Sequence, residues 1–243
     1  MKEAAEAFAA KHDKLHYLIN NAAVMGTPFA LTEDGFEEQM AATHFGHFTL
    51  TGLLMPKLQA SAPARVVTQS SMMHNFSGNL PFDDLNAKRN TWTIYSNVKL
   101  TNMLFTLELK KRLAAKAPGV IAVACHPGYT ATNLQLTAGK GPVWLMGCMN
   151  ALFAQDVRTG AQPQLYAALG EDIVSGDYTG PVSTSKGPAT KARGCAARRH
   201  RVHGADALPC PSHAGGARKA RHGRGGGGQA VGEDGSAHED GLP

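Results

Sequence analysis

Apolar residues in the first 192 positions alternate between short continuous runs and longer stretches with helical spacing. Three of the short runs have the length of buried strands: residues 15–19, 65–69 and 120–125. Three of the longer stretches have the spacing of amphipathic helices: residues 3–12, 32–58 and 92–116. Thr32 is expected to cap the second helix. This alternation predicts an α/β domain, in which helices cover both faces of a parallel sheet.

Polar motifs follow the three predicted strands at their carboxyl ends. These motifs are Asn20-Asn21-Ala22-Ala23, Ser70-Ser71 and His126-Pro127-Gly128. Open α/β sheets bind their ligands outside the carboxyl ends of the strands. We therefore expect the three motifs to meet at one edge of the sheet and to form a ligand site there.

Tyr95 and Lys99 lie four residues apart on the last predicted helix, so they share one face of it. A free tyrosine has a pKa of about 10, and a cation within about 4–6 Å can lower a pKa by roughly 1–3 units. Lys99 would thereby bring the pKa of Tyr95 closer to the range of a general acid–base catalyst. Ser71, at the end of the neighbouring strand, could hold a substrate oxygen beside Tyr95. Taken alone the spacing is a weak signal, because many helices pair an exposed lysine with a partly buried tyrosine.

The order and spacing of these motifs, followed by Pro127-Gly128-x-x-x-Thr132, resemble the short-chain dehydrogenase/reductase family. Residues 44–48, 95–109 and 126–128 resemble the branch that contains retinol dehydrogenases and WW-domain oxidoreductases. The resemblance covers roughly residues 3–190, and it implies a Rossmann-like, doubly wound parallel sheet.

The resemblance implies an oxidoreductase that moves hydride between NAD or NADP and a small-molecule alcohol or carbonyl of apolar or lipid-like character. Tyr95 would be the general acid–base, Lys99 would lower the pKa of Tyr95, and Ser71 would orient the reacting oxygen. The cofactor-binding residues that the resemblance implies are Asn21, Ala22, Tyr95, Lys99, Pro127, Gly128, Thr130 and Thr132. Residues 137–155 would form a substrate lid, although ordinary core packing explains their apolar character equally well. Family members often pair through the helices expected at 32–58 and 92–116, which implies a homodimer.

Three departures from the family pattern weaken the functional reading. Thr43 stands where the family has a fourth catalytic residue, an asparagine, and Ala23 replaces a usual glycine. No strand and glycine-rich turn precede Leu15, so we expect the chain to be truncated at its N-terminus, as a fragment or an incomplete gene model. The alternative function is a non-catalytic remnant or interaction protein of the same fold that cannot bind cofactor.

The composition changes near residue 192, which divides the chain into a catalytic domain (1–192) and a tail (193–243). The tail is a mixture of Arg, Gly, Ala and His, and its basic residues supply most of the net charge of +5. We expect this tail to be disordered or to be the product of a frameshift. A nucleic-acid-binding arm is the weaker alternative, because aromatic residues that could stack on bases are absent from it.

The cysteines give no sign of disulfides or of a metal site. Cys125, Cys148, Cys195 and Cys210 are widely spaced, and their spacing together with the histidines of the tail fits no zinc template. The N-terminal residues lack the apolar segment of a signal peptide, and residues 143–153 are too few to cross a bilayer, which takes about 20. We therefore expect a cytoplasmic protein with no transmembrane segment and no bound metal.

Overall fold

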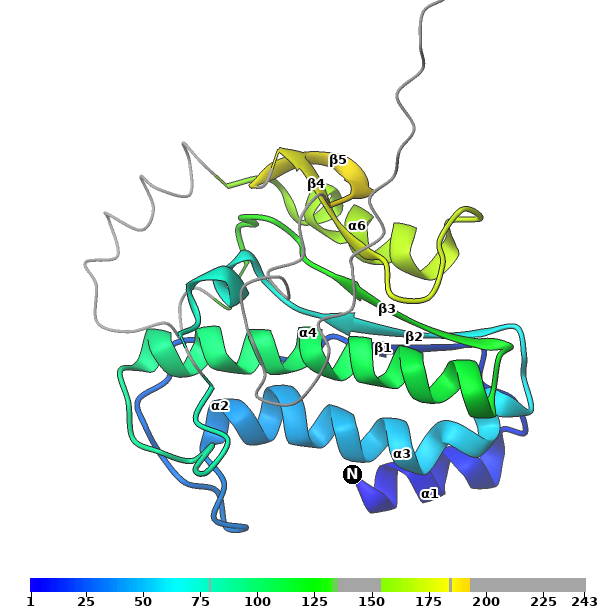
Figure 1. Ribbon diagram of the computed structural model, residues 1–243, viewed down its shortest axis with the longest axis horizontal. Helices are drawn as coiled ribbons and strands as arrows, with labels where there is room; N and C mark the ends of the chain where they lie inside the picture. Colours follow the sequence, from blue (N-terminus) through cyan, green and yellow to red (C-terminus); the bar gives the residue numbers. More distant parts are fainter. Residues whose placement is uncertain (79, 133, 135–153, 184, 193–243) are drawn as a thin grey trace, which may run out of the picture. The chain divides into compact units, whose positions relative to one another are not determined.

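A computed structural model describes residues 1–78, 80–132, 134, 154–183 and 185–192. In this part of the chain the strands form one sheet in the order β1-β2-β3-β4-β5 (Figure 1). The strands are β1 (Tyr17–Asn20), β2 (Ala64–Gln69), β3 (Val120–Cys125), β4 (Tyr178–Ser183) and β5 (Lys186–Lys191). The first four are parallel, and β5 pairs antiparallel with β4.

Helices cover both faces of this sheet, as the sequence predicts. They are α1 (Lys2–Lys11), α2 (Glu38–Met40), α3 (Gly46–Gln59), α4 (Thr91–Lys116) and α6 (Val157–Leu169), with a π-helical turn η1 (Ala41–Phe45) and a 3-10 turn η2 (Met72–Phe76). The helices α3 and α4 lie side by side on one face, and α6 packs on the other face (Figure 1). The doubly wound, Rossmann-like arrangement predicted from the sequence is therefore confirmed.

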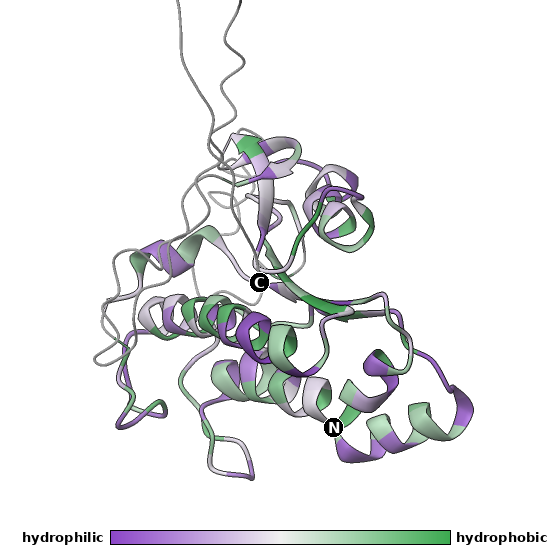
Figure 2. Ribbon diagram, turned by 45° about the vertical axis from the view of Figure 1, so that its right-hand side comes forward, coloured by the Kyte–Doolittle hydropathy of each residue, from purple (hydrophilic) through white to green (hydrophobic). Residues whose placement is uncertain are grey.

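The two faces of the sheet build separate cores from alternate residues of the same strands. On β2, Val66 packs with Leu54 and Leu58 of α3, whereas Val67 packs with Ala167 of α6. Successive side chains of a strand point to opposite faces, so a strand buried on both faces must be apolar at consecutive positions. Figure 2 shows this pattern as hydrophobic colour along the strands, with both colours on the helices.

The helix predicted from Thr32 begins later than expected. The Thr32 hydroxyl accepts a hydrogen bond from the Phe36 amide at 3.3 Å, and Gly35 has a φ of +79°, so this segment forms a turn. The helical region starts at Glu38, where the Glu37 carboxylate accepts a hydrogen bond from the Met40 amide at 2.8 Å. Thr32 as a helix cap was therefore wrong, because the glycine allows the chain to reverse before the helix starts.

The sequence analysis predicted the parallel strands β1 to β3 and did not predict β4 or the antiparallel edge strand β5. The strands β4 and β5 are separated by two residues, a length that permits a hairpin and excludes the long crossover that parallel neighbours need.

Residues 193–243 and most of the predicted lid, residues 137–153, lie outside the described part of the chain. Among the described helices, none combines the length and the apolar character that a membrane span requires.

Candidate active site

The parallel register brings the polar motifs to one edge of the sheet. Asn20 lies opposite Thr68, and Gln69 lies opposite Cys125, so β1, β2 and β3 end together. The segments that follow them, beginning at Asn21, Ser70 and His126, leave the sheet at the same edge. The sequence-based expectation that these motifs share an edge agrees with the structure.

Tyr95 and Lys99 lie on the face of α4 that packs against the sheet and against η2. Both are buried, with 5% and 2% of their surface exposed, and the Lys99 ammonium lies 5.5 Å from the centre of the Tyr95 ring. The Ser71 hydroxyl is a hydrogen-bond partner of the Tyr95 phenol. Ser71 and Lys99, which the sequence proposed as catalytic together with Tyr95, therefore both lie next to the Tyr95 side chain.

Burial controls the ionisation of Tyr95 and Lys99. It raises the pKa of Tyr95 to about 12, and the hydrogen bond from Ser71 opposes this shift. It lowers the pKa of Lys99 to about 8, with the Cys125 thiol opposing that shift. The expected lowering of the tyrosine pKa by Lys99 is not found in the protein by itself, because loss of hydration dominates the shift of Tyr95 and Ser71 alone opposes it. Tyr95 therefore carries its proton at neutral pH.

Hydrogen bonds tie this part of α4 to the end of β2. The Lys99 ammonium donates to the Gln69 carbonyl oxygen at 3.3 Å, and the Ser70 hydroxyl donates to the Lys99 carbonyl oxygen at 2.8 Å. The helix itself starts at Asn90, whose side chain accepts from the Trp92 amide. Lys99 is thus held by strand backbone rather than by an acidic side chain.

Thr43, which stands where the family has asparagine, is fully buried in the π-helical turn η1. Its hydroxyl accepts a hydrogen bond from the Val24 amide at 3.3 Å, which ties η1 to the segment after β1. Its carbonyl oxygen accepts from the Asn102 amide at 3.2 Å. The sequence analysis did not single out Asn102; the available signal was its position three residues after Lys99, on the same helical face.

The segment after β3 is held by residues from the C-terminal part of the domain. Gly128 has a φ of +72°, and a Cβ atom there would overlap the carbonyl oxygen of Ser185. The Thr130 hydroxyl donates to the Pro127 carbonyl oxygen at 3.1 Å. Gln155 bonds both this carbonyl oxygen and, at 3.0 Å, the Gly187 amide. Gln155 was expected to end a lid, and no sequence pattern indicated that it holds this segment.

The remaining residues assigned to cofactor binding are exposed. Asn21, Ala22 and Thr132 all lie at the surface, at the edge where the strands end. The Asn21 side-chain oxygen accepts a hydrogen bond at 3.2 Å from Gln164 on α6. These residues are thus free to meet a ligand, whereas Tyr95 and Lys99 are enclosed by the fold.

The donor set fits the nicotinamide end of a dinucleotide. A phenol, an ammonium and a hydroxyl meet at the carboxyl edge, and the exposed Asn21 and Thr132 lie on the segments that leave the sheet at the same edge. The pyrophosphate needs backbone amides at a helix N-terminus that follows a glycine-rich turn. In the described residues no strand is followed by such a turn, so the fit extends to the nicotinamide half alone.

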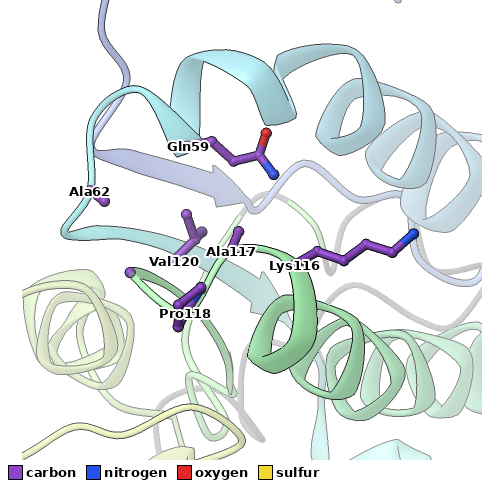
Figure 3. A pocket seen from close by; sticks show the side chains of 7 residues that line it. Gln59, Ala62, Lys116, Ala117, Pro118 and Val120 are labelled. Atoms are coloured by element: carbon purple, nitrogen blue, oxygen red, sulfur yellow. The ribbon is translucent and has the colours of Figure 1, made fainter.

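Other kinds of site lie elsewhere or are not found in the described residues. A pocket of about 350 Å³ opens at the opposite end of the sheet, where β3 begins and α3 and α4 end (Figure 3). The residues that line it are Gln59, Ala62, Lys116, Ala117, Pro118, Gly119 and Val120. Within the described ranges, no three His, Cys, Asp or Glu side chains are grouped so that they could hold a metal ion. The side chains suited to acid–base chemistry that the sequence singled out are those at the carboxyl edge.

Sequence comparisons connect this chain with known oxidoreductases. Residues 1–141 match the family described as short chain dehydrogenase. Retinol dehydrogenase 12 of Homo sapiens is 42% identical over 178 residues, which cover 72% of this chain and 55% of the relative. Retinol dehydrogenase 13 of Homo sapiens is 41% identical over 198 residues, covering 76% and 59%. The chain thus spans somewhat more than half the length of these relatives.

Solved structures agree on the fold. A crystal structure of a protein from Mycobacterium paratuberculosis matches with a TM-score of 0.62 and 36% identity, covering 79% of this chain and 63% of that one. Salutaridine reductase from Papaver somniferum matches with a TM-score of 0.52 and 18% identity, covering 73% and 76%. At that lower identity, the second match supports the architecture alone.

Proposed function

Because the chain belongs to the short-chain dehydrogenase family, we propose that it is an oxidoreductase that transfers a hydride between NAD or NADP and an apolar alcohol–carbonyl pair. The observation that carries this proposal is the convergence of Ser71 and Lys99 on the Tyr95 phenol, at the edge where the parallel strands end. Proton transfer and charge stabilisation at one oxygen atom are what carbonyl reduction requires of a protein.

A nicotinamide held at the carboxyl edge by Tyr95, Lys99 and the segment after β3 would supply the hydride chemistry at the carbonyl carbon. During reduction the Tyr95 phenol gives its proton to the substrate oxygen, while the Ser71 hydroxyl holds that oxygen in place. The raised pKa of Tyr95 keeps the phenol protonated and ready to act as the acid. The Lys99 ammonium, close to the ring, stabilises the phenolate that remains.

The same residues would hold the cofactor. Lys99 and Tyr95 would bond the nicotinamide ribose, and the segment from Pro127 to Thr132 would border the nicotinamide ring. The exposed Asn21 and Ala22 would line the adenosine-ribose side. The positive φ of Gly128 supports this placement, since it turns the segment after β3 back toward the C-terminal hairpin.

An apolar substrate is supported by exposed aromatic side chains on α4 and η2. Trp92 meets the Tyr95 ring edge-on at 6.2 Å and is 42% exposed, and Phe76, at the end of η2, is 73% exposed. Exposed aromatic side chains next to a catalytic group favour an apolar ligand. Retinol dehydrogenases are among the relatives, so retinal is the first substrate to test.

The test is nucleotide binding followed by turnover. The whole chain is titrated calorimetrically with NAD, NADH, NADP and NADPH, and nicotinamide oxidation is then followed with retinal and, as a polar control, glyceraldehyde. We expect one nucleotide pair to bind and retinal to be reduced faster than glyceraldehyde. A folded sample that binds none of the four nucleotides contradicts the proposal.

A second candidate function is a non-catalytic protein that keeps the fold. Two observations favour it: Thr43 uses its hydroxyl to hold the Val24 amide, and the described residues lack a glycine-rich turn between a strand and a helix. This candidate predicts a folded protein without nucleotide affinity, so the same titration separates the two functions.

A further inference from the structure

Asn102 is a buried polar residue that the proposed reaction does not use. It lies on α4 three residues after Lys99, on the face that packs against the sheet, and none of its surface is exposed. An amide in such a position must find partners for two N–H donors and a carbonyl oxygen, or the fold loses about 1–3 kcal/mol for each group left unpaired. Its partners therefore show what it holds in place.

The Asn102 amide connects α4 to two other elements. Its nitrogen donates to the Gln69 carbonyl oxygen at 3.0 Å and to the Thr43 carbonyl oxygen at 3.2 Å. Two carbonyl acceptors fix which end of the amide is nitrogen, because oxygen could not donate to them. Its oxygen lies 2.9 Å from Nδ1 of His44, so this ring nitrogen must carry the proton of the neutral histidine.

The Gln69 carbonyl oxygen is shared by Asn102 and Lys99. It accepts from the Lys99 ammonium at 3.3 Å and from the Asn102 amide at 3.0 Å. Gln69 is the last residue of β2, and Ser70 and Ser71 follow it directly. A shift of this carbonyl would move the anchor of the lysine and the start of the serine segment together.

Resting on the proposed function, we propose that Asn102 is a positioning residue for that reaction: its amide fixes the Gln69 carbonyl that accepts from the Lys99 ammonium, and ties it to the Thr43 carbonyl of η1. Asn102 thereby places a side-chain amide from α4 beside Thr43, whose own side chain has no amide. Asn102 does not touch the reacting atoms, so its effect must act through Lys99.

The ionisable groups that face Lys99 explain why such a carbonyl anchor matters. They are Tyr95 on its own helix, Cys125 on β3 and His47 on α3. Burial raises the pKa of Cys125 to about 12 and lowers the pKa of His47 to about 4, so both are uncharged at neutral pH. The ammonium is therefore held by the Gln69 carbonyl in place of a carboxylate, and the orientation of that carbonyl controls the position of the ammonium.

The first experiment uses the unaltered chain and does not depend on activity. The ¹⁵N chemical shifts of the histidine rings identify the tautomer of each neutral histidine, with His44→Gln to assign the signal. We expect His44 to carry its proton on Nδ1. A proton on Nε2 would mean that the Asn102 amide is reversed, which would overturn the proposal.

The second experiment substitutes Asn102→Asp, which keeps the shape, removes the paired donors and adds a negative charge near Lys99. The pKa of the lysine that titrates near 8 should rise by at least about one unit in an NMR titration of the lysine side chains. With retinal, kcat should fall roughly 100-fold, as expected for a misplaced catalytic group, while KM changes little.

The matched control is Thr101→Val on the same helix. Its hydroxyl is also buried, and it donates to the Val98 carbonyl oxygen at 2.7 Å within α4. This variant should lose stability without changing the lysine pKa or kcat. Equal effects of both substitutions would reduce Asn102 to a structural role and overturn the inference. A wild-type chain without turnover would contradict the proposed function instead, and the histidine and lysine titrations would still decide the role of Asn102.

Discussion

Two groups of residues in the candidate site are held very differently. One group lies on α4, and the other lies on the segments after β1 and β3. Tyr95 and Lys99 are almost completely buried and are bonded to the ends of strands. Asn21, Ala22 and Thr132 are exposed, and the partner of Asn21 is a side chain of α6. The fold therefore fixes the proton-transfer groups in advance and leaves the ligand-facing residues open.

This difference predicts how substitutions should divide. Changes to Tyr95 and Lys99 should alter turnover, because their geometry exists before any ligand binds. Changes in the exposed segments should alter affinity and leave the rate of the chemical step nearly unchanged.

The largest effect is expected for Lys99→Met. Removing the charge should lower turnover on the order of 10²–10⁴-fold. It should also stabilise the fold at pH 7 by about 1–3 kcal/mol, because the lowered pKa of Lys99 shows that its charged form is disfavoured in the folded state. Urea unfolding and steady-state kinetics measure the two effects. The control Lys111→Met, at an exposed position of the same helix, should change neither by much; a matching loss there would refute the assignment.

Gly128→Ala should have the next largest effect. The residue has a positive φ, and the added methyl group would overlap the Ser185 carbonyl oxygen, so we expect a loss on the order of 2 kcal/mol or more in the free energy of unfolding. Nucleotide affinity should fall with it, because the whole segment must move. Gly52→Ala, at an open position in α3, should instead stabilise the fold by up to about 1 kcal/mol. A Gly128 variant as stable as wild type would show that this segment is loosely held.

The pH dependence of stability should reveal the buried His126 ring. Burial, and to a lesser degree the nearby His74, lowers the pKa of His126 from 6.5 to about 4. Between these values the unfolded chain binds a proton that the folded chain does not, so stability must fall as the pH drops from 6.5 to 4. In His126→Asn this fall should shrink by about 1–3 kcal/mol, as measured by urea unfolding at pH 8, 6 and 4.5. Parallel curves for the two proteins would contradict the assigned shift.

The smallest effect is expected for Asn21→Ala. This exposed position should change stability by less than about 0.5 kcal/mol, while nucleotide affinity falls several-fold with kcat unchanged. Gln164→Ala removes the same hydrogen bond from the other side and serves as the control. If both variants weaken binding equally, Asn21 acts through α6 rather than on the cofactor.

Hydrophobic patterning predicted the strands and the long helices because period and length are local properties of the sequence. The nearly continuous burial of β2 and β3 follows from this pattern. The turn before Glu38 was missed, because the glycine that reverses the chain lies inside an otherwise helical pattern. The hairpin of β4 and β5 was missed too, since these strands carry glycines, prolines and lysines instead of an apolar run.

Within the site, spacing predicted which side chains share an edge or a helical face, but not how each is bonded. The Tyr95–Lys99 pair followed from a four-residue spacing. The pKa of Tyr95 could not be predicted, because it depends on burial by segments distant in the sequence. Asn102 and Gln155 were missed for the same reason: their partners, Gln69 and Gly187, lie about thirty residues away along the chain.

The central claim, that Tyr95 passes the proton during hydride transfer at a nicotinamide, is tested most directly by isotope transfer. The whole chain and its Tyr95→Phe variant are each incubated with retinal and NADPH or NADH deuterated at C4, and the alcohol is analysed by mass spectrometry. The account predicts deuterium at the carbinol carbon with the wild-type chain, and almost none with the variant although nucleotide affinity is largely retained. Equal deuterium in the two alcohols would contradict it.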